Sequence, residues 1–170
     1  PLYSSAASDV YKRQVVSYTH GGGRIGVIVE ADTDVVNDAV KECLSNVAMQ
    51  VAALSPKYVA TTDVPEDYKE HEKELLMAQA QNDPKNANKP ANIIEKMITG
   101  RLAKELKEVC LLEQAYVKDG DLTVAKYIEQ VAKENGAKLS VKKFVRFETG
   151  EGLEKKVDDF AAEVAAQAGM

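Results

Sequence analysis

The chain has 170 residues, of which 45% are hydrophobic and 29% are charged, and its net charge is -5. This composition is typical of a folded domain with a buried core, and no apolar run is long enough to cross a bilayer. The acidic balance argues against a nucleic-acid-binding protein, because phosphate contacts need clustered Lys and Arg. Cys43 and Cys110 do not form a C-x-x-C pair, and both lie in apolar segments expected to be helical. This predicts two buried free thiols and therefore a reducing, cytoplasmic location.

The first fourteen residues differ from the rest of the chain, with a Ser/Ala cluster and no periodicity. We expect residues 1–14 to be non-native or unstructured and the chain to be a fragment. Two β-branched runs, residues 15–19 and 24–30, flank a glycine cluster. This pattern predicts a β-hairpin, because glycine adopts the positive φ that tight turns need.

Apolar residues at spacings of three and four predict a helix over residues 34–54. Thr33 or Asp34 can cap its first turn, and Pro56 ends it. A second side of this helix carries Met49, Gln50 and Ala53, here called the Met49 strip, which is small or weakly polar instead of charged. We expect this strip to pack, either within the protein's own fold or against a partner.

Two further helices are expected to form an antiparallel hairpin. Pro65 opens the first, which runs to about residue 81, and Pro90 opens the second. Both have narrow apolar seams, which is typical of a two-stranded coiled coil. Residues of the second seam are expected only to hold this arm together; they include Ile94, Ile98 and Leu102.

In the last part of the chain, the sequence pattern predicts a helix that Thr123 caps and Gly136 ends, followed by a strand over residues 139–148. In this strand Leu139, Val141, Val145 and Phe147 alternate with polar residues and are expected to face the core. Burial of that face requires pairing with the first hairpin.

The expected fold is therefore α+β. A small antiparallel three-stranded sheet packs with helices, the helical hairpin is inserted as an arm, and an amphipathic C-terminal helix follows. The expected segments are an N-terminal segment (1–14), a first core part (15–63), the arm (64–114), a second core part (115–149) and a C-terminal helical module (150–170).

Residues for catalysis or metal binding are not grouped in the sequence. The Gly21–Gly23 cluster is not followed by the Gly-Lys-Ser/Thr of a P-loop, so a hairpin turn is favoured over a phosphate site. His20 and His71 have no Cys or carboxylate at metal-ligand spacing. We therefore expect a binding protein with no cofactor, and not an enzyme with chemistry of its own.

Four blocks of the sequence resemble the elongation factor Ts family, and they occur in the family's order. They are SYTHGGGRIGV (17–27), NVAMQVAA (46–53), IEKM, GRL and EVCLLEQ (within 94–114), and FVRFETGEG with DFAAEVA (within 144–165). The resemblance covers nearly all of the chain from Val15 onward. It implies the C-terminal core half, the coiled-coil dimerisation arm and the C-terminal module of that family.

The family's N-terminal half is missing from the matched region, and with it the Thr-Asp-Phe motif that disturbs the partner's nucleotide and magnesium site. Thr33-Asp34-Val35 and Thr62-Asp63-Val64 lack the Phe. Neither lies in the half of the family that carries the motif, so its role is not transferred to them.

The resemblance implies binding to elongation factor Tu and promotion of GDP release in translation, together with a possible homodimer through the arm. The candidate contacts are Met49, Gln50 and Ala53 on the helix, and Phe160 and Val164 in the C-terminal module. Packing within the chain's own core remains the alternative for all five. A binding and dimerisation module without exchange activity is the alternative function.

Overall fold

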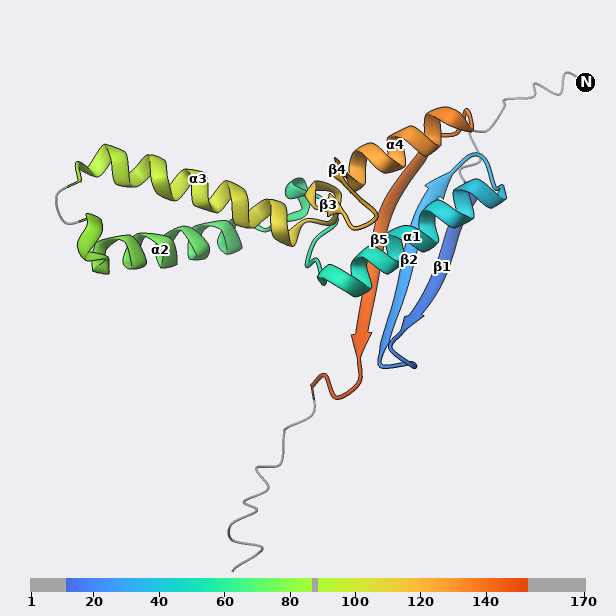
Figure 1. Ribbon diagram of the computed structural model, residues 1–170, viewed down its shortest axis with the longest axis horizontal. Helices are drawn as coiled ribbons and strands as arrows, with labels where there is room; N and C mark the ends of the chain where they lie inside the picture. Colours follow the sequence, from blue (N-terminus) through green and yellow to red (C-terminus); the bar gives the residue numbers. More distant parts are fainter. Residues whose placement is uncertain (1–11, 87–88, 153–170) are drawn as a thin grey trace, which may run out of the picture.

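The computed structural model describes residues 12–86 and 89–152. A sheet with two helices on one side forms the body of the protein, and a helical hairpin projects from it (Figure 1). The α+β class predicted from the sequence is confirmed. The expected C-terminal helix and the segment 1–11 lie outside the described residues.

The sheet has three strands, β1 (Lys12–His20), β2 (Ile25–Thr33) and β5 (Leu139–Glu148), in the order β1-β2-β5. Both neighbouring pairs are antiparallel, so the late strand lies beside the first hairpin as predicted. Gly21, Gly22 and Gly23 form the β1–β2 turn with φ values of 61°, 67° and 89°. Residues with a side chain rarely adopt such positive φ angles, which explains the run of three glycines.

β1 begins earlier than the sequence pattern indicated. Lys12 pairs with Thr33 and Gln14 with Ala31, so residues 12–14 belong to the sheet and not to an unstructured segment. The three residues carry no alternation of their own, and the ladder with β2 determines their conformation.

A β-bulge changes which side chains of β5 face the core. Ala31 pairs with Val141 but Glu30 pairs with Lys143, so β5 has one extra residue at this point. The extra residue reverses the alternation that follows it. Phe144 packs against the core, whereas Phe147 is 56% exposed. The inward position expected for Phe147 is therefore wrong.

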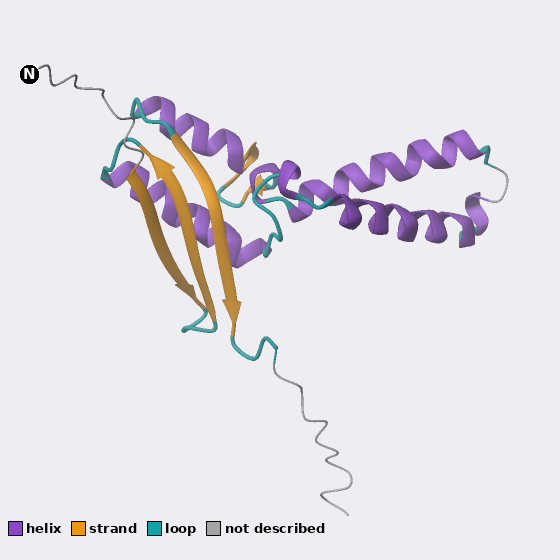
Figure 2. Ribbon diagram, turned by 180° about the vertical axis from the view of Figure 1, so that it is seen from behind, coloured by secondary structure: helices purple, strands orange, loops and turns teal. Residues whose placement is uncertain are grey.

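Two helices, α1 (Asp38–Leu54) and α4 (Val124–Glu134), lie on the same face of the sheet (Figure 2). The side chain of Asn37 accepts a hydrogen bond from the Val40 N–H and caps α1, because β2 continues through Thr33. The cap predicted at Thr33 or Asp34 is wrong by one turn. Thr123 caps α4 as predicted.

One apolar core lies between these helices and the sheet. It contains the apolar stripe of α1, the inward residues of β2, and parts of α4 and β5; its fully buried members include Val27, Val29, Val40, Cys43, Leu44, Val47, Val51, Leu111 and Val124. Cys43 and Cys110 are both buried free thiols, as predicted.

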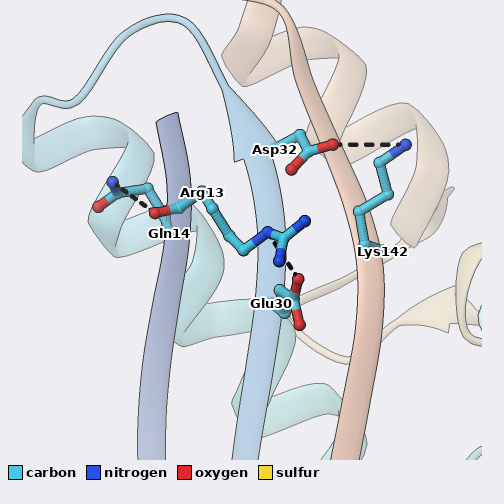
Figure 3. A network of polar contacts seen from close by, with 5 residues as sticks. All are labelled: Arg13, Gln14, Glu30, Asp32 and Lys142. Carbon is cyan, nitrogen blue, oxygen red and sulfur yellow. Dashed lines mark hydrogen bonds and ion pairs between the residues drawn. The ribbon is translucent and has the colours of Figure 1, made fainter. Parts of the chain in front are cut away.

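The opposite face of the sheet carries charged pairs across its strands. Arg13 Nε lies 3.0 Å from Glu30 Oε1, and Lys142 Nζ lies 3.5 Å from Asp32 Oδ2 (Figure 3). These side chains are exposed or half-buried, so the pairs add little to stability. Their main effect is to make this end of the outer face polar.

The projecting arm consists of α2 (Glu66–Asn82) and α3 (Ala91–Val109), which lie side by side (Figure 1). Leu76, Ala80 and Ile98 are buried between the two helices, and Ile94 and Leu102 pack against them. The expectation that this seam holds the arm together is confirmed. A coiled-coil geometry for the arm remains a prediction.

The arm joins the body at a neck, formed by residues 57–59 and 109–112. The N–H groups of Lys57 and Tyr58 donate to the Val109 carbonyl at 2.8 and 3.1 Å. In the other direction Leu111 donates to the Tyr58 carbonyl at 2.9 Å, and Leu112 donates to the Val59 carbonyl at 3.0 Å. Leu111 itself is fully buried in the core of the body.

Three short 3-10 helices connect these elements, at Thr61–Asp63, Pro84–Asn86 and Leu111–Glu113. After the last of them comes a small hairpin that the sequence analysis did not predict. It consists of β3 (Ala115–Tyr116) and β4 (Asp119–Thr123), with Val117 and Lys118 at its tip.

Candidate partner-binding surface

The Met49 strip divides into a buried and an accessible part. Gln50 is fully buried, Met49 is half-buried and Ala53 is exposed. Of the two alternatives left open for this strip, Gln50 therefore follows packing within the protein's own fold, and its side chain is not available for direct contact with another protein. Met49 and Ala53 remain accessible near the C-terminal end of α1.

Gln50 is buried because the β3–β4 hairpin lies over this side of α1. Its Nε2 donates to the Ala115 carbonyl at 3.0 Å and to Gln114 Oε1 at 3.2 Å. Its Oε1 accepts a hydrogen bond from the Val117 N–H at 2.9 Å. A buried amide is tolerated only when it has such partners. The three bonds connect α1 to positions 64 to 67 residues further along the chain.

Asn46, one helical turn before Gln50, contacts the same region. Its Nδ2 donates to the Tyr127 hydroxyl at 2.8 Å, and its Oδ1 accepts from Lys118 Nζ at 2.7 Å. The ring of Tyr127 stacks on that of Tyr116, with centroids 4.2 Å apart. Asn46 therefore links the tip of the hairpin to α4.

Burial controls the titration of the groups beneath the hairpin. It raises the pKa of the Cys43 thiol to about 11, against a smaller opposing effect of the hydrogen bond with Tyr127. Burial is also the main cause of the raised pKa values of Tyr116 and Tyr127. All three side chains are therefore neutral at physiological pH, which suits a packing role and not nucleophilic chemistry.

Apolar side chains are exposed around the end of α1. Leu54 is 48% exposed and Val117 is 43% exposed. Leu54 and Ala115 line a groove of about 550 Å³ together with charged residues that include Lys104, Lys107 and Glu108 of α3. The surface is therefore an apolar patch bordered by charges, which is the usual make-up of a protein-binding site.

The remaining candidate residues have other positions. Phe160 and Val164 lie outside the described residues. The Thr33 hydroxyl is part of a local turn with the backbone of Val35, and Asp34 Oδ1 accepts from the Lys138 N–H at 2.7 Å. Thr33 and Asp34 thus stabilise the connection between β2 and α1.

Within residues 12–86 and 89–152, no group of three or more His, Cys, Asp or Glu side chains is arranged to hold a metal ion. The same part of the chain has no helix that is long and apolar enough to span a membrane.

Comparison with known proteins supports a family assignment. The family model for elongation factor TS matches residues 5–151. Elongation factor Ts of Clostridioides difficile (strain 630) is 52% identical over 161 residues, which cover 95% of this chain and 52% of that protein. Elongation factor Ts of Desulforamulus reducens is 52% identical over 157 residues, covering 90% of this chain and 70% of the relative. The chain thus spans about half the length of the clostridial relative, and it belongs to the elongation factor Ts family.

Proposed function

We propose that this chain binds elongation factor Tu in the cytoplasm and promotes release of GDP from it during protein synthesis. The proposal rests on membership of the elongation factor Ts family, whose matched region includes the body and the arm. No bond is made or broken on the factor in this mechanism. The factor binds the nucleotide-free partner more tightly than the loaded one, so factor and nucleotide weaken each other's binding reciprocally.

The feature of the structure that supports such a contact is the accessible apolar patch at the end of α1, here called the docking face. Its members are Met49, Ala53, Leu54 and Val117. The buried Gln50 places Val117 next to α1, and Leu54 shares a groove with Ala115. Desolvated apolar anchors contribute most of the affinity in protein interfaces, which favours this face for the contact.

A non-exchanging binding and dimerisation module is the second candidate. It is favoured by the lack of a Thr-Asp-Phe sequence in the described residues, where the Thr-Asp pairs at 33–34 and 62–63 are each followed by Val. A protein with equal affinity for the loaded and empty partner shifts no equilibrium between them. Binding without faster GDP release is the expected behaviour of such a module.

Calorimetry and stopped-flow kinetics distinguish the two. Calorimetric titration into elongation factor Tu, with and without GDP, measures the affinity and its dependence on nucleotide. Release of a fluorescent GDP analogue then measures exchange. Faster release with weaker binding in the presence of GDP supports the exchange factor. Binding that is indifferent to GDP, with release at the uncatalysed rate, supports the module, and absence of binding refutes both.

Ala53→Glu tests the docking face directly. Ala53 is exposed, so the substitution should leave the melting temperature nearly unchanged while it places a charge against the partner. Ala78→Glu is the matched control, since Ala78 is an exposed alanine on α2 of the arm. Equal binding by the two variants would place the contact elsewhere.

A further inference from the structure

We propose that Asn46 and Gln50 are positioning residues that hold the β3–β4 hairpin rigid, so that its tip and the end of α1 form one preorganised docking face. This inference rests on the proposed binding to elongation factor Tu. In this inference the two amides neither contact the partner nor fill the apolar core; they position the β3–β4 hairpin.

The β3–β4 hairpin cannot hold this position by itself. β3 has two residues, β4 has five, and their register is irregular between Ala115 and Tyr116. Isolated two-stranded hairpins are marginally stable at best in water. The orientation of Val117 and Lys118 at the tip must therefore come from contacts with the rest of the body.

The two amides supply those contacts from a single helix face. Asn46 and Gln50 are four residues apart, so their side chains lie one above the other on α1. Gln50 bonds the backbone on both sides of Tyr116, at the Ala115 carbonyl and the Val117 N–H. Asn46 bonds the side chain of Lys118 beyond them.

Tyr116 completes the attachment, because it is buried and its ring stacks on Tyr127. The hairpin is thus held on its backbone by Gln50, on its ring by Tyr127, and at its tip by Asn46. None of these bonds joins α1 to the three-stranded sheet. Their direct effect is on the placement of the hairpin.

Rigid placement matters for binding because a mobile tip must be ordered when the partner docks. Ordering even one or two backbone residues costs enough conformational entropy to weaken binding by about tenfold or more. Loss of either amide should therefore lower affinity through the mobility of the tip, without a direct contact between the amide and the partner.

The test compares Asn46→Leu, Asn46→Asp and Gln50→Leu with the unmodified chain. An aspartate at position 46 can still accept from Lys118 Nζ, although it loses the donor to the Tyr127 hydroxyl, so it should hold the tip of the hairpin, whereas leucine cannot. Asn46 is only half-buried, so both variants at this position should fold even where Gln50→Leu does not. Nitrogen-15 relaxation of the amides of residues 117–120 measures the mobility of the tip, and calorimetry measures affinity for elongation factor Tu.

The expected result is a more mobile tip and affinity about tenfold lower for Asn46→Leu and Gln50→Leu, with near-normal values for Asn46→Asp. A mobile tip with unchanged affinity would overturn the inference, as would lower affinity with an unchanged tip, which indicates direct contact. If the unmodified chain does not bind elongation factor Tu, the proposed function fails first, and the two failures are distinguishable.

Discussion

Shortening the arm should leave the body folded, provided that the deletion stops before the neck. The buried cluster of the arm, around Leu76 and Ile98, is separate from the core of the body. A variant that lacks residues 66–107, joined by a short Gly/Ser linker, keeps all four backbone hydrogen bonds of the neck and keeps Leu111. Its free energy of unfolding should stay within about 2 kcal/mol of the parent chain.

A longer deletion, of residues 65–112, removes nearly all of the arm segment suggested by the sequence (64–114), and this variant should fail to fold. It removes the four hydrogen bonds of the neck, each worth about 1 kcal/mol net. It also removes Leu111, a fully buried side chain whose loss costs about 2–5 kcal/mol. The sum of about 6–9 kcal/mol is comparable to the entire stability of a typical domain.

Urea unfolding followed by circular dichroism, with the signal expressed per residue, distinguishes the two deletions. The shorter variant should show one cooperative transition, and the longer one should show a broad transition or none. A shorter variant without a cooperative transition would mean that arm and body fold as one unit. Equal stability of the two deletions would mean that the neck and Leu111 contribute little, contrary to their burial.

Three further predictions concern stability and assembly. Gln50→Leu should lower the free energy of unfolding, measured in urea, by about 2–4 kcal/mol, because it leaves buried backbone groups unpaired. The control Gln81→Leu, at an exposed position, should change the same free energy by less than about 0.5 kcal/mol. Because burial raises the pKa of Cys43 to about 11, the unfolded chain loses this proton first, so stability should fall between about pH 9 and pH 11. Cys43→Ala should remove about 2 kcal/mol of that fall in urea titrations at the two pH values. If the chain dimerises through its arm, sedimentation should show a dimer that the 66–107 deletion converts to a monomer; a dimer that survives the deletion would place the contact on the body.

Local patterns predicted most of the secondary structure, because those elements bury one regular face. The three glycines at the β1–β2 turn, the stripe of α1 and the two proline-led arm helices all have strong local signals. The sheet order also followed from the need to bury the apolar face of β5. These features depend on residues close together in sequence or on a single long-range requirement.

The errors occurred where tertiary contacts override a local pattern. The bulge opposite Glu30 turned Phe147 outward, and alternation alone gives no sign of an extra residue. The helix cap moved to Asn37 because β2 extends further than its β-branched run. The short β3–β4 hairpin had only the Asp119-Gly120 pair as a signal, and that pair follows the tip instead of forming it.

The position of Gln50 shows why the candidate site could be predicted only in part. A glutamine on a helix surface and a glutamine buried under a hairpin have the same local sequence pattern. The difference lies in partners 64 to 67 residues away, of which one is a backbone N–H and another a backbone carbonyl. Backbone partners leave no trace in side-chain patterns, so no spacing rule could have identified them.

This arrangement also determines which surface is left for a partner. α1 has the sheet on one side and the hairpin on another, and towards its C-terminal end Met49, Ala53 and Leu54 remain at least partly accessible. The docking face therefore combines a helix end and a tip that are more than 60 residues apart in sequence and are joined by the Gln50 hydrogen bonds. We therefore expect binding at this face to respond to loss of the Gln50 hydrogen bonds as well as to changes at its surface. The comparison of Asn46→Leu with Asn46→Asp tests the role of the hairpin, because the two variants differ in whether position 46 can bond Lys118 at the tip, and neither replaces a member of the docking face.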